Sequence, residues 1–173
     1  MKENIILIGM PGAGKSTVGV VLAKMLTMDF LDSDLVIQKK EGRRLSRIIE
    51  EEGSAGFIEI ENRINAALDA ENTVIATGGS AVYGADAMRH FSRIGTIVYL
   101  RLSFPAVRER LKDLHGRGVV IKKGQTLQDL YEERCVLYEH YADLIIDEDG
   151  QSIQETLTCL TEALKRHPDD MKT

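Results

Sequence analysis

The segment "GMPGAGKST", Gly9 to Thr17, has the glycine, lysine and hydroxyl spacing of a phosphate-binding loop. It follows a short apolar run and opens a helical pattern, so backbone N–H groups and the positive end of the helix can surround phosphate oxygens. We expect Lys15 to reach the terminal phosphates as a catalytic residue and the Ser16 hydroxyl to bind Mg²⁺. The alternative is a glycine-rich turn that binds nothing. The residues expected around the phosphates are Gly12, Ala13, Gly14, Lys15, Ser16 and Thr17.

Two carboxylates, Asp32 and Asp34, follow the second apolar run in "LDSD". They fall at the carboxyl end of a predicted strand, which is the edge where open α/β sheets hold their ligands. One carboxylate is expected near Mg²⁺, and the other is expected to accept a hydrogen bond or a proton from an acceptor hydroxyl. The alternative is helix capping, because Ser33 or Asp34 before "LVIQKK" is a good N-cap residue.

A second glycine-containing turn, "ATGGS" at residues 76–80, follows the third apolar run. It falls at the same edge of the predicted sheet as the two carboxylates. Adjacent Gly78 and Gly79 would let the backbone approach a ligand closely, because neither residue carries a side chain. A tight strand-to-helix turn without a ligand is the alternative.

The segment "LHGRGVVIKKGQT" is a basic stretch between two helical patterns, punctuated by glycines. It contains Arg117 and is predicted to be a mobile lid near the phosphate site, with a plain solvated loop as the alternative. Arg110 lies in the helical pattern before this segment, and Arg134 lies in the pattern after it. Guanidinium groups bind carboxylates and phosphates as forks, so both arginines are candidate ligand contacts, although either one alone could lie on a solvated face.

Short β-rich runs alternate with longer helical patterns along the chain, which predicts a parallel sheet with helices on both faces. The runs are apolar at successive positions, as expected for strands that are covered on both faces. Two helical patterns lie between the second and third strands, which is more than a simple crossover needs. The main helical patterns are Lys15 to Leu26, Leu35 to Glu52, Pro105 to Leu114 and Ser152 to Arg166.

The composition indicates a soluble protein with a small partner. With 173 residues and a net charge of -5, the chain has no general basic field for nucleic acid or an anionic membrane, and no apolar run long enough to span a bilayer. Its two cysteines form no CxxC pair, which suits the cytoplasm. We expect a cytoplasmic monomer with one domain over residues 1–173, a subdomain at about 33–62 and a lid at about 114–124.

The motifs, taken in order, resemble the shikimate kinase family across nearly the whole chain. The matching segments are the Walker A loop, "FLDSDLVIQ", "GFIEIE", "ATGGS", the Arg117 segment and "ERCVLYEHYAD". The resemblance implies a P-loop kinase domain of the nucleoside-monophosphate-kinase-like α/β class, with three layers, a five-stranded parallel sheet and a mobile lid. It also implies ATP and Mg²⁺, and transfer of the γ-phosphoryl group to the 3-hydroxyl of shikimate in aromatic amino acid biosynthesis.

The same resemblance implies roles for individual residues. Asp32 would lie near Mg²⁺, and Asp34 would be the catalytic residue that takes the acceptor hydroxyl. Arg117 would be a catalytic lid residue that closes over the phosphates, and Arg110 would lie near the adenine. Arg134 would bind the acceptor's carboxylate, and the region at about 33–62 would help to bind the acceptor. The residues expected at the acceptor are Asp34, Ile58, Gly78, Gly79, Ser80 and Arg134.

The chain departs from the family pattern mainly on the acceptor side. Where the family typically has G-E-x-x-F-R-x-x-E, this chain has Ser54 for the glutamate and Ile58 for the arginine. Ser80 replaces a third glycine, "RGVV" replaces R-P-L-L, and Val136 replaces a proline. The residues expected to bind ATP are intact, so the departures concern what is phosphorylated.

Ile58 is the departure with the largest expected consequence. Phe57, Ile60 and Ile64 share one face of a helix, whereas Ile58 points away from that face and is expected to face the acceptor pocket. One hydrogen bond from an arginine to a carboxylate contributes ~1.5 to 3 kcal/mol, so its loss should weaken binding of an acidic acceptor. Three other arginines lie nearby in the sequence, but their spacing does not place them in that pocket: Arg43, Arg44 and Arg63.

Three functions remain compatible with the sequence. The first is a shikimate kinase with altered acceptor contacts. The second is a kinase of the same family that phosphorylates another hydroxylated small molecule, which Ile58 and Ser80 favour. The third is a nucleotide-binding protein without turnover, which the intact Lys15 and Asp34 disfavour.

Overall fold

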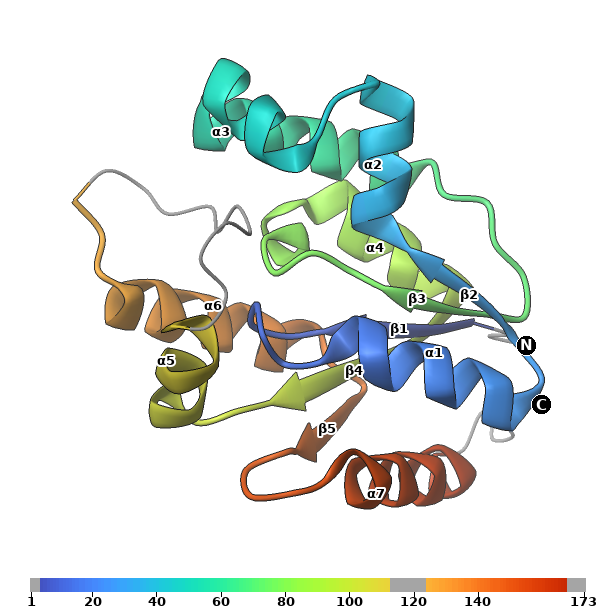
Figure 1. Ribbon diagram of the computed structural model, residues 1–173. Helices are drawn as coiled ribbons and strands as arrows, with labels where there is room; N and C mark the ends of the chain where they lie inside the picture. The colour runs from blue at the N-terminus through green and yellow to red at the C-terminus, as the bar shows by residue number, and fades with distance from the viewer. Residues whose placement is uncertain (1–3, 113–123, 168–173) are drawn as a thin grey trace.

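A five-stranded parallel sheet forms the middle layer, with the strand order β2-β3-β1-β4-β5 (Figure 1). Because every neighbouring pair is parallel, the carboxyl ends of the strands meet at one edge. In the central strand, Ile6 lies between Ile75 and Ile97, and burial on both faces is confirmed for β1, β3 and β4, whereas the edge strands β2 and β5 are partly exposed. The computed structural model describes residues 4–112 and 124–167. The strands are β1 (Asn4–Ile8), β2 (Asp29–Asp32), β3 (Thr73–Ala76), β4 (Gly95–Arg101) and β5 (Leu144–Asp147).

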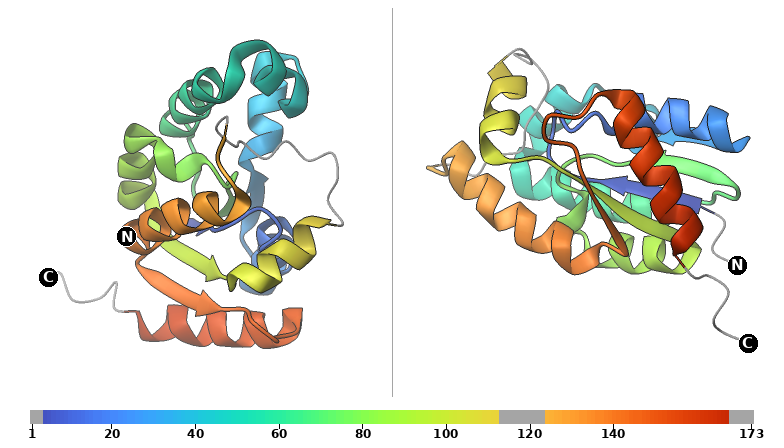
Figure 2. Two further views of the ribbon diagram at one scale, coloured as in Figure 1. Left: turned by 90° about the vertical axis from the view of Figure 1, so that its left-hand side faces the viewer. Right: turned by 90° about the horizontal axis from the view of Figure 1, so that it is seen from below.

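Helices cover both faces of the sheet, which confirms the three-layer α/β prediction (Figure 2). On one face α1 and α7 contact each other, and on the other face α4 and α6 contact β4 and η1. The helices are α1 (Lys15–Leu26), α2 (Ser33–Glu41), α3 (Leu45–Ala66), η1 (Ala81–Tyr83), α4 (Ala85–Ile94), α5 (Phe104–Lys112), α6 (Leu127–Tyr141) and α7 (Ile153–Arg166).

The helices α2 and α3 stand beyond the β2 side of the sheet in Figure 1 and pack on each other. They share a second hydrophobic cluster, separate from the main core, whose buried members are Ile37, Ile48, Phe57 and Ile64. Phe57 and Ile64 are each 3% exposed, as the helical period predicts. Ile58 is half-buried and packs against the same cluster.

The sequence pattern predicts one helix over Leu35 to Glu52, and the structure divides it. Gly42 ends α2 in the left-handed region, with φ 64°, and α3 begins three residues later. Only glycine adopts this conformation without steric cost, so the chain turns there although the flanking residues are good helix formers. A second glycine, Gly53 with φ 71°, kinks α3. This kink lies between the two helical patterns that the sequence predicts between the second and third strands.

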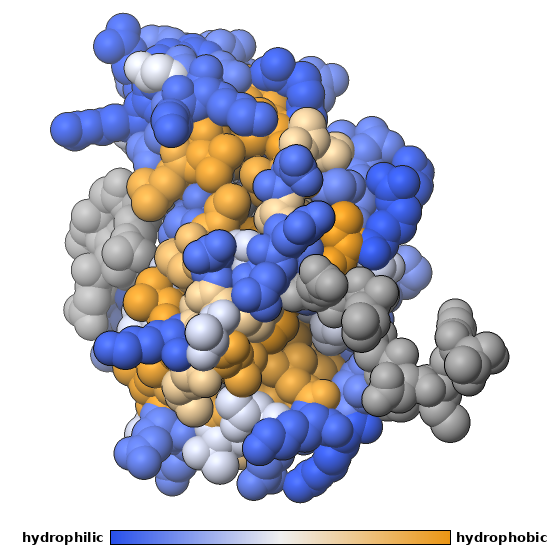
Figure 3. Space-filling view, turned by 90° about the vertical axis from the view of Figure 1, so that its right-hand side faces the viewer, coloured by the Kyte–Doolittle hydropathy of each residue, from blue (hydrophilic) through white to orange (hydrophobic). Residues whose placement is uncertain are grey.

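The main core lies on both sides of the sheet and includes β1, β3, β4 and the inner faces of the covering helices. Some large apolar side chains remain exposed on α1, among them Val20 and Met25. Figure 3 shows the end of the molecule away from the carboxyl ends of the strands, where apolar groups reach the surface between polar ones. Among the residues that the structure describes, no helix has both the length and the apolar character needed to span a bilayer.

Candidate functional site

The loop between β1 and α1 has the backbone conformation of a phosphate cradle. Gly9, Gly12 and Gly14 all have positive φ, at 147°, 85° and 73°. A Cβ on Gly9 would lie 2.6 Å from the carbonyl oxygen of Leu100, so this position has no room for a side chain. The helix α1 has no side-chain cap at its N-terminus, which leaves N–H groups of its first turn for a ligand.

Lys15, the first residue of α1, folds back over this loop. Its Nζ donates hydrogen bonds to the carbonyl oxygens of Gly9 (2.8 Å) and Met10 (2.9 Å), and the residue is only 8% exposed. Burial lowers the pKa of Lys15 to about 8, although the nearby Asp34 carboxylate opposes that change. The ammonium group is therefore held at the mouth of the loop, where a negatively charged ligand would stabilise its charged form.

Asp32 ends β2 and makes two contacts. Its Oδ2 accepts a hydrogen bond from Ser16 Oγ at 2.8 Å, and its Oδ1 accepts one from the backbone N–H of Asp34 at 3.0 Å. The N-cap of α2 is therefore Asp32, and not Ser33 or Asp34, the two candidates that the sequence pattern favoured. The pair of Ser16 and Asp32 brings a hydroxyl and a carboxylate together, and these are oxygen ligands that Mg²⁺ accepts.

A cavity of about 590 Å³ opens beside the phosphate loop. Its lining combines Lys15 and Ser16 with Asp34, Gly78 and Gly79 from the neighbouring strand ends. The Thr77 backbone N–H and hydroxyl both donate to the carbonyl oxygen of Leu7, at 3.1 and 2.9 Å, and thereby hold the "ATGGS" turn against β1. Residues far apart in the sequence thus meet in one cavity.

Both glycines of the turn are packed too tightly for a side chain. A Cβ on Gly78 would lie 2.8 Å from Asp34 Oδ1 and 2.6 Å from Glu61 Oε1. A Cβ on Gly79 would lie 2.9 Å from Arg134 Nη1. The turn therefore separates Asp34 from Arg134 by little more than backbone. The tight turn is present, and the expected close approach of its backbone to a ligand remains a prediction.

Arg134 lies on α6, is 1% exposed and stacks over the ring of Tyr83, with its Cζ 5.4 Å from the ring centroid. On the same helix, the Tyr138 hydroxyl donates to the carbonyl oxygen of Gly79 at 2.6 Å. These contacts fix α6 to the "ATGGS" turn, so a buried guanidinium is held directly behind that turn. The prediction that Arg134 binds a carboxylate remains a prediction.

Glu61 on α3 is a site residue to which the sequence analysis gave no role. It is 1% exposed, its Oε2 accepts a hydrogen bond from Ser80 Oγ at 2.5 Å, and its Oε1 has no hydrogen-bond partner in the described part of the chain. Burial raises the pKa of Glu61 to about 8. The available signal was the position of Glu61 on the helix face of Ile58, off the apolar stripe.

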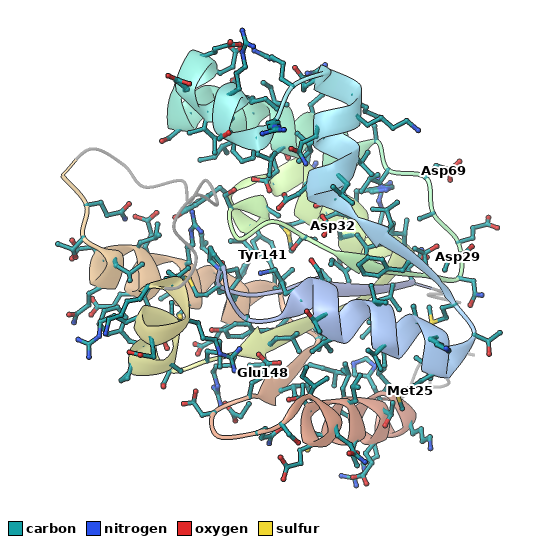
Figure 4. All side chains as sticks on the ribbon, in the orientation of Figure 1. Met25, Asp29, Asp32, Asp69, Tyr141 and Glu148 are labelled. Carbon is teal, nitrogen blue, oxygen red and sulfur yellow. The ribbon has the colours of Figure 1, made fainter. Side chains whose placement is uncertain are left out.

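Arg110 and Glu148 lie on the other side of the phosphate loop. Arg110 Nη1 donates to the carbonyl oxygen of Gly12 at 3.0 Å and lies 4.0 Å from Glu148 Oε2. Glu148 is 4% exposed, and burial raises its pKa to about 7. In Figure 4, Asp32 and Glu148 lie nearer to the phosphate loop than Asp29 and Asp69, which mark the opposite end of the sheet.

Six of the described residues that were predicted for the site are absent from the cavity lining: Gly12, Ala13, Ile58, Ser80, Arg110 and Arg134. Ile58 is absent from its lining and packs against the second hydrophobic cluster. Arg117 lies outside the described residues, as does nearly all of the expected lid. Ser80 is 5% exposed and contributes to the site through Glu61. The described acceptor side of the cavity therefore depends on Asp34 and the two glycines.

Comparison with known proteins identifies one family. The model of the family described as shikimate kinase matches residues 11–165. The shikimate kinase of Pasteurella multocida (strain Pm70) is 37% identical over 167 residues, which cover 94% of this chain and 95% of the relative. The structure of shikimate kinase from Acinetobacter baumannii in complex with shikimate is 31% identical, with a TM-score of 0.87 and coverage of 98% and 96%. Shikimate kinase from Aquifex aeolicus vf5 is 32% identical, with a TM-score of 0.80 and coverage of 94% and 96%.

Proposed function

The chain belongs to the shikimate kinase family, and we propose that it transfers the γ-phosphoryl group of MgATP to the 3-hydroxyl of shikimate. The observation that carries this proposal is that Asp34 and Lys15 line the same cavity. Asp34 is suited to a hydroxyl and Lys15 to a phosphate, so the phosphoryl donor and the acceptor would meet between these two side chains. Holding the two reactants in line is the main contribution that a protein makes to phosphoryl transfer.

The chemistry assigns a different task to each side chain. Lys15 and the N–H groups of the loop hold the β- and γ-phosphates and stabilise the charge that shifts during transfer. The Asp34 carboxylate orients the acceptor hydroxyl and takes its proton as the oxygen attacks phosphorus. Arg134 binds the acceptor's carboxylate from behind the Gly79 turn, and Arg110 contacts the nucleotide from the Gly12 side.

We also propose that Ser16 and Asp32 hold Mg²⁺. Their Oγ and Oδ2 atoms are 2.8 Å apart, and a small hard cation accepts both oxygen types. When bound, Mg²⁺ would neutralise negative charge on the phosphates. The proposal also includes a lid at about 114–124 that contains Arg117, a cytoplasmic location and a monomeric state. Light scattering in solution would test the monomeric state.

A second candidate function is phosphorylation of a different hydroxylated small molecule. The specific observation in its favour is Ile58, which supplies no charge where the family typically has an arginine. ADP release from MgATP, measured with shikimate and with a panel of hydroxy acids, polyols and nucleosides, separates the two functions. Saturable turnover with shikimate, and little with the panel, supports the first. ATP binding without stimulation by any acceptor would remove both enzyme functions.

A further inference from the structure

Arg44 occupies a wall of the cavity that the sequence did not assign to the site. It is the N-cap residue of α3, directly after the turn at Gly42, and it lines the cavity together with Asp34 and Lys15. The residue is exposed to solvent. The α2–α3 unit therefore contributes an exposed arginine to the lining of the cavity from a position other than 58.

The backbone around Arg44 is fixed while its side chain is available. The carbonyl oxygen of Arg44 accepts hydrogen bonds from the N–H groups of Arg47 and Ile48, both at 3.0 Å. The next residue, Leu45, donates its N–H to Gln38 Oε1 at 3.2 Å, which holds the start of α3 against α2. A side chain that projects from an anchored segment loses less freedom on binding than one from a loose loop.

The neighbouring arginines are already paired with acids. Arg43 contacts Glu51 at 2.5 Å and Glu52 at 3.0 Å. Arg47 contacts Glu51 at 2.6 Å, and Arg63 contacts Glu41 at 3.1 Å. In the described part of the chain, Arg44 has no hydrogen bond or ion pair from its guanidinium to an acid. It is the arginine of the α2–α3 unit that can bind a ligand without first breaking an ion pair.

The charge distribution of the cavity indicates what this ligand group would be. Asp32 and Asp34 disfavour an anion near them, and Lys15 lies at the phosphate end. The positive end of α3 adds to the Arg44 guanidinium at its own wall of the cavity. An acceptor that carries a hydroxyl and a carboxylate could place the hydroxyl at Asp34 and the carboxylate at Arg44.

We propose that Arg44 is a specificity-determining residue that binds the carboxylate of the acceptor, and that it replaces the arginine which the family typically has at position 58. This inference rests on the proposed function, because it assumes that the acceptor is shikimate. Ile58 can then remain packed on the hydrophobic cluster without loss of the second guanidinium at the acceptor.

Steady-state kinetics of the full chain test the inference. Arg44→Ala should raise KM for shikimate by ~10- to 100-fold and leave KM for ATP unchanged, because one charge-assisted hydrogen-bonding group is lost. For Arg44→Lys, KM for shikimate should lie between those of the wild type and Arg44→Ala, since lysine keeps the positive charge but lacks the forked guanidinium. Arg47→Ala is the matched control, because this arginine lies one turn further along α3 and is paired with Glu51. Circular dichroism of each variant checks folding.

An acceptor without a free carboxylate tests whether Arg44 contacts that group. With the methyl ester of shikimate as acceptor, the wild type and Arg44→Ala should have the same KM, because the group that Arg44 binds is masked. If the wild type does not phosphorylate shikimate, the proposed function fails and this inference fails with it. If the wild type is active and Arg44→Ala keeps its KM for shikimate, or changes only KM for ATP, the inference alone is overturned.

Discussion

Replacement of Glu61 by glutamine tests whether the site holds a neutral carboxyl group. The pKa of Glu61 is raised from an ordinary 4.5 to about 8, mainly by burial, so the folded state favours the protonated form. Stability from this group is fully present below about pH 4.5 and is lost as the pH rises through about 8. Glutamine is neutral at every pH and keeps an oxygen that can accept from Ser80, so Glu61→Gln avoids this loss.

The size of the effect follows from the displaced pKa. A change from 4.5 to about 8, at about 1.4 kcal/mol for each pH unit, corresponds to about 5 kcal/mol. Compared with the wild type, Glu61→Gln should therefore gain up to about 5 kcal/mol in free energy of unfolding between about pH 5 and about pH 9. Most of that gain should come between about pH 5 and about pH 8, because the charge on Glu61 is nearly complete above its folded pKa.

Urea unfolding, followed by circular dichroism across this pH range, measures the difference. Glu59→Gln is the control, because it makes the same substitution at an exposed position on the same helix. The reasoning is refuted if the stability difference between Glu61→Gln and the wild type does not change with pH. In that case Glu61 would be ionised in the folded protein near neutrality, with its charge stabilised by Ser80 and Arg134.

The other predictions concern catalysis. Lys15→Ala should abolish phosphoryl transfer in the ADP-release assay, and full activity would exclude the phosphate-loop assignment. Asp34→Asn should lose turnover while ATP affinity, measured by calorimetry, stays nearly unchanged; a large drop in ATP affinity would contradict an acceptor-side role. Gly79→Ala places a methyl group 2.8 Å from Pro11 Cδ and 2.9 Å from Arg134 Nη1, so the phosphate-loop proline and the guanidinium are both crowded. KM for shikimate should then rise by roughly tenfold or more, and an unchanged KM would contradict a role for this tight packing in placing the acceptor.

The elements that the sequence predicts well are those set by local pattern. The predicted bounds of α1, Lys15 to Leu26, agree with the structure because the phosphate loop defines the start of that helix. The end of α7 at Arg166 agrees as well. Ser152 is the N-cap at the start of this helix and forms a capping box there. The division at Gly42 was missed, because residues on both sides of this glycine favour a helix and the sequence pattern does not reveal its left-handed conformation.

The residues of the candidate site also divide into those that local sequence pattern predicts and those that it does not. Lys15, Asp34 and Gly78 each follow a strand, so the parallel sheet brings them to one edge and motif spacing is enough to find them. Glu61 had only the weak signal of its place on the helix face of Ile58, and Glu148 had none, because an acidic residue in a helix or after a strand is usually exposed. Their burial depends on contacts with Ser80 and Arg110, which are distant in the sequence.

Two departures from the family pattern meet at Glu61. An arginine at position 58 would lie three residues before Glu61 on α3, at the spacing where side chains pair along a helix, whereas Ile58 packs on the hydrophobic cluster. Ser80, in place of a glycine, donates its hydroxyl to Glu61, and a raised pKa removes the charge that an arginine would have balanced. The two substitutions are therefore compatible within one buried contact, although neither supplies a positive charge for the acceptor's carboxylate. In our proposal that charge comes from Arg134 behind the Gly79 turn and from Arg44 at the start of α3, so the kinetics of Arg44→Ala bear directly on how this chain binds an acidic acceptor.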